Sequence, residues 1–244
     1  MSQKSEFIAG LINPEVLQNA LENDTGAEAL AIKKCGILEI RYDLFENERE
    51  WGEISQKVFE LSPKALRLGT IRLKKDGGLW EDRRPRRGAI NRALTGGKKL
   101  DWIDIEREMY NYPALLNTKV IRSWHLFDRV PNEQELNEFA EECIALQAEG
   151  CKVAAMAHSK NEVQVLYDFA KKYGKKFELF SAFAMGKHGK ESRIRSLKEG
   201  ANLTYASIGK ALAPGQLSVE ELFDIINADY LPTLPLHAAY FCLP

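Results

Sequence analysis

A lysine and a histidine lie in two apolar segments of this sequence and have side chains suited to chemistry on a carbonyl compound. Lys152 lies in the segment 151–156, C-K-V-A-A-M, and His125 lies in the segment 123–127, S-W-H-L-F. Lysine is rarely buried without a partner, and desolvation favours its neutral amine, which can attack a carbonyl carbon. A histidine beside that amine can move the protons that imine formation requires. If the two segments are neighbouring strands, the pair predicts Schiff-base chemistry. The alternatives are a lysine that reaches solvent from the start of a strand and a hydrogen-bonded core histidine.

Further charged side chains alternate along other apolar segments. In the run E-I-R-Y-D, the period of a strand places Glu39, Arg41 and Asp43 on one face, and Arg72 repeats this pattern in T-I-R-L. A charged side chain that points into a protein destabilises the fold unless it is ion-paired or binds a ligand. An internal network of ion pairs and a ligand site are therefore equally open for these residues.

The segments that follow later strands offer groups for binding an anion. Arg193 ends the stretch M-G-K-H-G-K-E-S-R, and a guanidinium can give a carboxylate two parallel hydrogen bonds; a solvated basic loop is the alternative. Gln216 ends A-P-G-Q, which suits either a lid or an ordinary loop. For Asp104 and Glu106 we expect salt bridges with neighbouring strands. We interpret one further cluster as a solvated loop of mixed charge: Glu81, Asp82, Arg83, Arg84, Arg86 and Arg87.

Apolar segments typical of strands recur about every 30 residues, which is the size of one β-α unit. They are residues 7–12, 36–45, 65–73, 102–107, 119–127, 151–157, 177–185 and 202–208. Helical patterns occupy residues 14–33, 132–149, 159–173 and a stretch from 218 onward. The sequence therefore predicts an α/β fold, a (β/α)₈ TIM barrel forming a single domain over residues 1–244, with its active site at the carboxyl ends of the strands. A doubly wound open sheet is the alternative, but no G-x-G-x-x-G follows the first strand.

Composition excludes several classes of function. The chain has 244 residues, with 34 Lys and Arg against 35 Asp and Glu, so nothing favours nucleic acid or an anionic membrane as a partner. Residues 230–244 are too short to span a membrane and contain three prolines, and the first residues do not form a secretory signal. The four cysteines include no C-x-x-C pair, which favours a reducing cytoplasm over a zinc site or disulfides.

Taken together, these segments resemble the type I 3-dehydroquinate dehydratase family, the Schiff-base dehydratases of the shikimate pathway. The resemblance covers most of the chain, and its pieces occur in the family's order. They are E-I-R-Y-D at 39–43, T-I-R at 70–72, G-G at 77–78, I-D-I-E at 103–106, S-W-H-L-F at 123–127, C-K-V-A at 151–154, M-G at 185–186, S-R at 192–193 and A-P-G-Q at 213–216.

The resemblance implies a barrel that forms a homodimer, needs no metal or organic cofactor and takes 3-dehydroquinate as its small-molecule substrate. The implied reaction is dehydration to 3-dehydroshikimate, in which Lys152 forms an imine with the ring ketone and His125 moves the protons. Asp76 stands where the family has a glutamate near the catalytic histidine, so it joins the expected catalytic residues. The implied substrate-binding residues are Arg193 and Gln216 for the carboxylate, and Glu39, Arg41 and Arg72 for the ring hydroxyls.

Three positions depart from the family's pattern. Asp76 is shorter than glutamate, Leu212 replaces a serine before A-P-G-Q, and Gly10 aligns where the family often has a serine. These departures leave two alternatives open. One is an imine-forming lyase or dehydratase for a related cyclic keto acid, and the other is a catalytically silent barrel that binds a small carboxylate.

Overall fold

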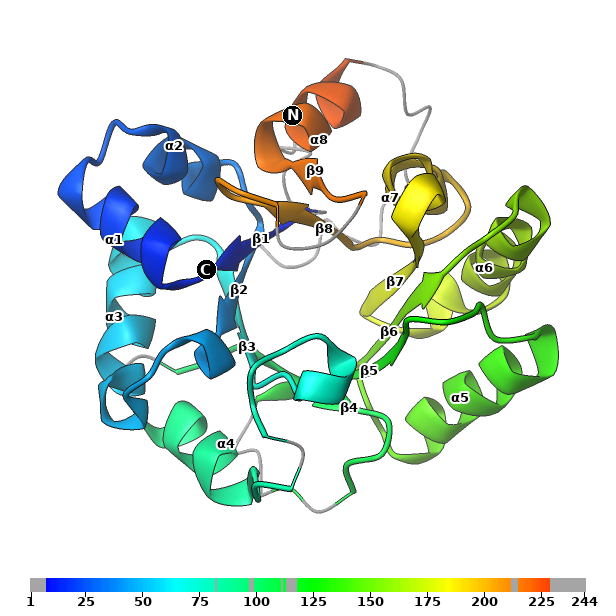
Figure 1. Ribbon diagram of the computed structural model, residues 1–244, viewed down its shortest axis with the longest axis horizontal. Coiled ribbons are helices and arrows are strands. Elements are labelled where there is room, and N and C mark those ends of the chain that lie inside the picture. Colours follow the sequence, from blue (N-terminus) through cyan, green and yellow to red (C-terminus); the bar gives the residue numbers. More distant parts are fainter. Residues whose placement is uncertain are drawn as a thin grey trace.

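A single curved sheet of parallel strands, surrounded by helices, makes up the described part of the chain (Figure 1). The computed structural model describes residues 8–81, 83–96, 99–110, 112, 118–211 and 215–228. Within these residues the strands are β1 (Ile8–Ile12), β2 (Ile37–Arg41), β3 (Leu66–Thr70), β4 (Trp102–Glu106), β5 (Lys119–Leu126), β6 (Gly150–Met156), β7 (Leu179–Met185), β8 (Thr204–Ser207) and β9 (Leu217–Ser218). They are hydrogen-bonded in the order β7-β6-β5-β4-β3-β2-β1-β8-β9.

The strands curl until the two ends of the series approach each other, and this confirms the predicted barrel. The backbone N–H groups of Asn202 and Leu203, just before β8, both donate to the carbonyl oxygen of Phe180 in β7, at 3.1 Å each. Eight of the strands match the segments expected from the sequence, while the two-residue β9 was not expected. The prediction of one domain over residues 1–244 extends beyond the described residues and stays a prediction.

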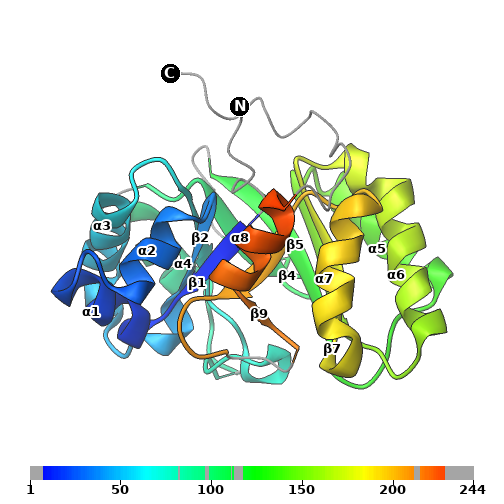
Figure 2. The same ribbon diagram turned by 90° about the horizontal axis from the view of Figure 1, so that it is seen from above.

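Helices cover the outside of the sheet, with α1 to α4 along one half and α5 to α7 along the other (Figure 2). They are α1 (Pro14–Glu22), α2 (Ala27–Lys33), α3 (Trp51–Leu61), α4 (Arg87–Thr95), α5 (Glu133–Ala145), α6 (Lys160–Tyr173), α7 (Gly189–Lys198) and α8 (Val219–Asn227). Side-chain caps explain several starting points. The N-caps Asn132 and Ser218 each form a reciprocal capping box with a glutamate three residues later.

The single helix expected over residues 14–33 is wrong, because the chain turns between α1 and α2. Asn23 accepts hydrogen bonds from the backbone and hydroxyl of Thr25, and the N–H of Gly26 donates to the carbonyl of Asn23. Asparagine side chains that bond their own backbone two residues on compete with helix formation. The start of the helix was expected correctly, with Asn13 as its N-cap and Pro14 in its first turn.

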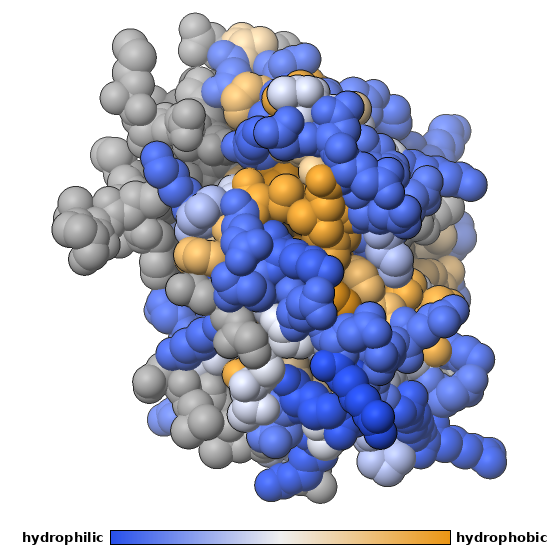
Figure 3. Space-filling view, turned by 90° about the vertical axis from the view of Figure 1, so that its left-hand side faces the viewer, coloured by the Kyte–Doolittle hydropathy of each residue, from blue (hydrophilic) through white to orange (hydrophobic). Residues whose placement is uncertain are grey.

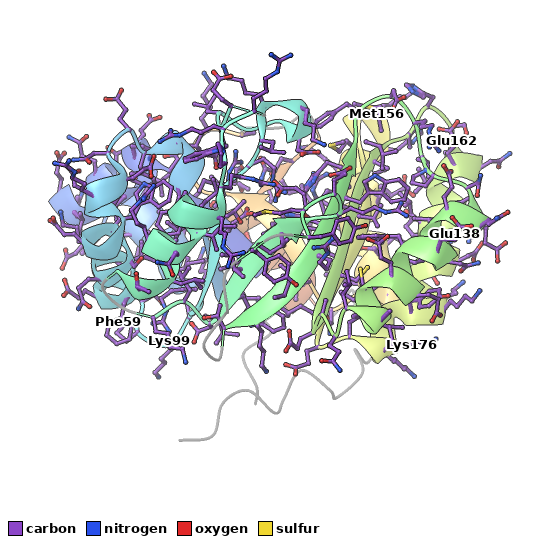
Figure 4. The ribbon with its side chains drawn as sticks, turned by 90° about the horizontal axis from the view of Figure 1, so that it is seen from below. Phe59, Lys99, Glu138, Met156, Glu162 and Lys176 are labelled. Carbon is purple, nitrogen blue, oxygen red and sulfur yellow. The ribbon has the colours of Figure 1, made fainter. Side chains whose placement is uncertain are left out.

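Apolar side chains fill the barrel at the amino ends of the strands, and the polar residues of the lumen lie nearer the carboxyl ends. The lumen contains a cluster that includes Ile37, Leu68, Trp102, Ile121, Leu179 and Leu203. Figure 4 shows the two ends of the barrel: Met156, at the carboxyl end of β6, lies on the edge opposite Phe59, Lys99 and Lys176. In a packed barrel of this kind, only the carboxyl end has room for a ligand.

The outer surface is mostly polar, as Figure 3 shows for the side that carries α1 to α3. An apolar area interrupts it, and among the described residues Leu21 of α1 and Leu30 of α2 are exposed. The part of the chain that the structure describes contains no helix long and apolar enough to cross a membrane.

Candidate active site

Lys152 lies buried in the middle of β6, as expected, and it has partners of opposite charge. Its Nζ donates to Oδ2 of Asp104 at 3.2 Å and lies 3.8 Å from Oε1 of Glu39. The aromatic ring of Tyr205 lies on another side, with its centroid 3.9 Å from Nζ. The sequence argument considered desolvation alone. The attraction of two carboxylates and one aromatic face opposes that desolvation, so the structure surrounds the amine with groups that stabilise a positive charge.

Asp104, on β4, binds residues of β5, β6 and the segment that follows β3. It accepts hydrogen bonds from Nη2 of Arg72 at 2.6 Å, from Lys152 and from the hydroxyl of Ser123. Burial by itself raises the pKa of this carboxyl, but the positive charges of Arg72 and Lys152 outweigh burial and hold the pKa well below its usual range. Asp104 is therefore a fixed negative charge at the centre of the site.

His125 lies one layer above Lys152, because Ser123 pairs with Lys152 and His125 with Ala154 in the β5–β6 register. Nη1 of Arg72 is 2.9 Å from the Ser123 hydroxyl oxygen and 3.5 Å from Nδ1 of His125. Burial lowers the pKa of the imidazole well below 6.5, and the positive charges of Arg72 and Lys152 lower it further. The ring is consequently neutral at pH 7 and able to accept a proton.

Asp76 is a buried carboxyl with one unsatisfied oxygen. It ends the short 3₁₀ helix Lys74–Asp76 after β3, and its Oδ2 has no hydrogen-bond partner among the described residues. Burial, followed by the negative charge of Glu106, raises its pKa to about 6. A carboxyl that titrates close to neutrality in such a place is suited to proton transfer. The structure gives no direct contact between Asp76 and His125.

Glu39 and Arg41 both project from β2 toward this end of the barrel. Oε1 of Glu39 accepts from the hydroxyl of Thr70 at 2.9 Å, in addition to facing Lys152. Arg41 is bound by Asp43, which follows it in the 3₁₀ helix Tyr42–Leu44. The prediction that Glu39 and Arg41 lie on one face of the strand is therefore confirmed. Asp43 lies beyond the end of the strand, where the chain turns.

Arg72 and Glu106 form a second buried network with Arg86. Nη1 of Arg72 donates to Glu106 at 3.0 Å, and Arg86 donates to the other oxygen of Glu106 and, at 2.9 Å, to the carbonyl of Ile71. The interpretation of residues 81–87 as a solvated loop is thus wrong for Arg86, which is buried, while Arg83, Arg84 and Arg87 are exposed. Residue 86 lies next to the segment that follows β3, and a contact between residues this far apart in sequence cannot be predicted from the local pattern of charges.

Arg193 lies on the far side of the barrel, within α7 rather than in the preceding loop. It is 2% exposed, and its Nη1 donates to the carbonyls of Gly215 at 2.8 Å and Ala184 at 3.3 Å. Burial lowers its pKa to about 10, so the guanidinium stays charged at pH 7. Its Nε is buried without a hydrogen bond, and no acidic side chain of the described residues pairs with it. A buried cation in this condition is a candidate for an anionic ligand.

The structure thus brings most of the predicted residues into one network and places the others at its edge. The ring of Phe183 connects the two parts: it lies 4.3 Å from the Arg193 guanidinium carbon and 6.1 Å from the Tyr205 ring, which faces Lys152. Gln216 follows Gly215 and is half-buried. Leu212 lies outside the described residues. No group of three or more His, Cys, Asp or Glu residues able to hold a metal ion occurs within the described ranges.

Sequence reasoning did not assign site roles to four residues of this network. Asp104 and Glu106 were expected to form structural salt bridges, Ser123 was quoted only as part of a motif, and Tyr205 was not singled out. Strand alternation could have found all of them. Each lies an even number of residues from a recognised or lumen-facing position on its own strand or directly before it: Ser123 from His125, and Tyr205 from Leu203.

Comparison with known proteins points to one family. Residues 14–232 match the family model described as type I 3-dehydroquinase. The 3-dehydroquinate dehydratase of Methanococcus maripaludis strain C7 is 32% identical over 205 residues, which cover 81% of this chain and 89% of the relative. The 3-dehydroquinate dehydratase of Syntrophotalea carbinolica is 30% identical over 227 residues, which cover 87% and 88% of the two chains.

Solved structures agree with this result. The 3-dehydroquinate dehydratase of Geobacillus kaustophilus superposes with a TM-score of 0.75 at 22% identity, covering 91% of this chain and 90% of that one, and shows the shared fold. The type I enzyme of Clostridium difficile, solved with covalently modified comenic acid, has a TM-score of 0.72 at 25% identity and covers 91% and 90%.

Proposed function

The chain belongs to the type I 3-dehydroquinase family of lyases, and we propose that it dehydrates 3-dehydroquinate to 3-dehydroshikimate through an imine on Lys152. This reaction is the third step of the shikimate pathway to aromatic amino acids. One observation carries the proposal: a buried amine lies between two carboxylates, one layer below a histidine that is neutral at pH 7.

The first half of the reaction forms the imine. Lys152 attacks the ring ketone as a neutral amine, so a proton must leave its nitrogen, and the oxygens of Asp104 are already occupied by Arg72, Ser123 and Lys152. The neutral imidazole of His125 is available to accept this proton. The imidazolium returns this proton to the carbinolamine hydroxyl, which leaves as water, and the resulting iminium withdraws electrons from the adjacent carbon. Asp104 and Glu39 stabilise the positive charge of this iminium.

The second half removes the hydroxyl group. His125 takes the acidified C–H proton, the electron pair forms the new double bond, and the hydroxyl on the next carbon leaves as water with a proton from the imidazolium. A second water molecule hydrolyses the imine, which releases the enone and restores the amine. Ionised Asp76 contributes a negative charge that favours the imidazolium, although the structure shows no bond between the two groups.

The binding roles follow from which donors are already occupied. Arg193 keeps its charge and has an unpartnered Nε, so we propose that it holds the substrate carboxylate together with Gln216. Glu39 and Arg41 remain candidates for the ring hydroxyls. Arg72 donates to Asp104, Glu106 and Ser123, so we assign it to holding Asp104 and His125 in place rather than to binding hydroxyls.

Borohydride trapping tests this function. The protein is incubated with 3-dehydroquinate and reduced with borohydride, and its intact mass is measured by mass spectrometry. In a parallel assay, ultraviolet absorbance follows the conjugated enone. We expect a stable adduct on Lys152 and enone formation, both lost in Lys152→Ala and retained in the control Lys160→Ala. An adduct without enone would indicate a related cyclic keto acid as the substrate. No adduct at all would contradict the proposal and favour a silent carboxylate-binding barrel.

A homodimer and a cytoplasmic location are further expectations from the family resemblance. Sedimentation velocity measures the first, and we expect a single species of twice the 27.6 kDa chain mass. A species of the chain mass alone at micromolar concentration would contradict it.

A further inference from the structure

Asp43 is a fully buried carboxylate whose hydrogen bonds go to a predicted substrate-binding residue and to a catalytic loop. Its side chain is 0% exposed. Oδ1 accepts from Nε of Arg41 at 2.9 Å, and Oδ2 accepts from Nη2 of Arg41 at 2.8 Å. Oδ2 also accepts from the backbone N–H of Leu79 at 3.0 Å. Because both oxygens are occupied and hidden from solvent, Asp43 has no group left with which to touch a substrate.

The bidentate contact sets the orientation of the Arg41 guanidinium. A guanidinium is planar, so fixing Nε and Nη2 determines the direction of the whole group. Among the described residues, no acceptor bonds Nη1 of Arg41, and Nη1 is not among the buried unpartnered atoms. One edge of the guanidinium is therefore held by the protein, while another donor stays open on the side that solvent reaches.

The bond to Leu79 ties the same carboxylate to the loop that carries Asp76. The turn 76–79 includes Gly77 with φ +82°, and a Cβ at Gly78 would lie 2.1 Å from the carbonyl oxygen of Arg72, so the backbone of this turn lies close against Arg72. The N–H of Gly78 bonds to the carbonyl of Leu73, which closes the turn. The contact with Asp43 then fixes the turn against the end of β2.

The charge on Asp43 persists at every pH at which the neighbouring acid titrates. Burial by itself raises the pKa of Asp43, but the hydrogen bonds and the charge of Arg41 outweigh burial and lower the pKa below 3.8. Asp76, with a pKa of about 6, changes its charge while Asp43 stays ionised. The hydrogen bonds by which Asp43 joins Arg41 to the backbone of Leu79 are consequently independent of the protonation of Asp76.

We propose that Asp43 is a positioning residue that holds the open donor of Arg41 toward the substrate and fixes the loop of Asp76 at the same time. The inference rests on the proposed function for its effect on substrate binding. It goes beyond that function because it explains why the carboxylate two residues after Arg41 matters although it meets no substrate.

The test compares Asp43→Ala with Asp101→Ala, a matched pair at opposite ends of the barrel. Oδ2 of Asp101 also accepts from an arginine, Nη2 of Arg67, and from a backbone N–H, that of Arg67 itself at 2.8 Å. It lies just before β4, on the side away from the site. Both variants should lose stability. Only Asp43→Ala should raise KM for 3-dehydroquinate, by about ten- to a hundredfold, the value of about 1.5–3 kcal/mol for a misplaced charged hydrogen bond.

A double-mutant cycle shows whether the effect passes through Arg41. In an Arg41→Ala background, Asp43→Ala should change KM by no more than about twofold, because the residue that it positions is gone. Equal effects in both backgrounds would overturn the proposal. If Asp43→Ala does not fold, Asp43→Asn takes its place, since its amide nitrogen removes one acceptor and faces a donor instead.

A second readout does not depend on turnover. The amide of Leu79 should exchange with deuterated solvent faster in Asp43→Ala than in the wild type and in Asp101→Ala. Unchanged protection of this amide would refute the bracing role. If the wild type forms neither adduct nor enone, the proposed function fails, and this measurement alone decides whether Asp43 braces the loop.

Discussion

Asp76→Asn is expected to make the protein more stable at pH 8 and to leave its stability unchanged below about pH 4. The pKa of Asp76 is about 6 in the folded protein against 3.8 as the ordinary value. A carboxyl with a raised folded pKa binds its proton more tightly when folded, so its ionisation costs stability as the pH rises through this interval. The asparagine side chain does not ionise, so this loss of stability is absent in the variant, and the side chain has nearly the same volume.

The magnitude follows from the shift. About two pKa units correspond to an upper limit of about 3 kcal/mol. Solvent on the open side of Asp76 screens the interaction, which reduces the expected gain to about 1–2 kcal/mol. For a domain of this size the gain raises Tm by about 2–8 °C. The difference between variant and wild type should grow from about pH 4 to about pH 7 and then stay constant.

Urea unfolding at a series of pH values measures this difference. Asp168→Asn is the matched control, because it makes the same carboxyl-to-amide change at an exposed position on α6, far from the site. A flat difference between Asp76→Asn and the wild type over pH 4–8, or one that falls with rising pH, would refute the reasoning. If Asp76 has the proposed catalytic role, the same variant should turn over more slowly above pH 6, so that it is more stable and less active than the wild type.

Three further predictions concern the site. His125→Ala should lower kcat by about 10²–10⁴-fold while the trapped adduct on Lys152 still forms, which mass spectrometry and enone absorbance together measure. Arg193→Lys should weaken binding of 3-dehydroquinate, seen as a raised KM, more than it disturbs stability, seen in the urea midpoint, because lysine cannot give a carboxylate two parallel hydrogen bonds; an unchanged KM would remove the carboxylate role. The acid limb of the wild-type kcat/KM profile should fall near pH 6 and should be absent in Asp76→Asn; a limb that persists would show that another group causes it.

The order of the elements and the type of fold could be predicted from local sequence alone. Apolar runs mark β1 to β8 because parallel strands buried on both faces are mostly apolar. The starts of α5 and α8 were readable because Asn132 and Ser218 cap their own helices through residues three positions on. The break between α1 and α2 was missed although its cause is equally local. The turn from Asn23 to Gly26 interrupts an apolar stripe that is otherwise continuous.

The individual site residues were also visible in the sequence, but their partnerships were not. Lys152, His125, Arg72 and Glu39 stand out because each is a polar residue within an apolar segment of the sequence. Which of them are paired depends on how the strands curl. Asp104 binds Lys152 and Arg72, which are 48 and 32 residues away in sequence, and a buried Arg86 reaches Glu106 from what resembles a solvated loop. Strand periodicity determines which face of the sheet a side chain is on. The curvature of the closed sheet decides which charges meet across the lumen and are paired, and which buried charge, like Arg193 on α7, has no acidic partner among the described residues.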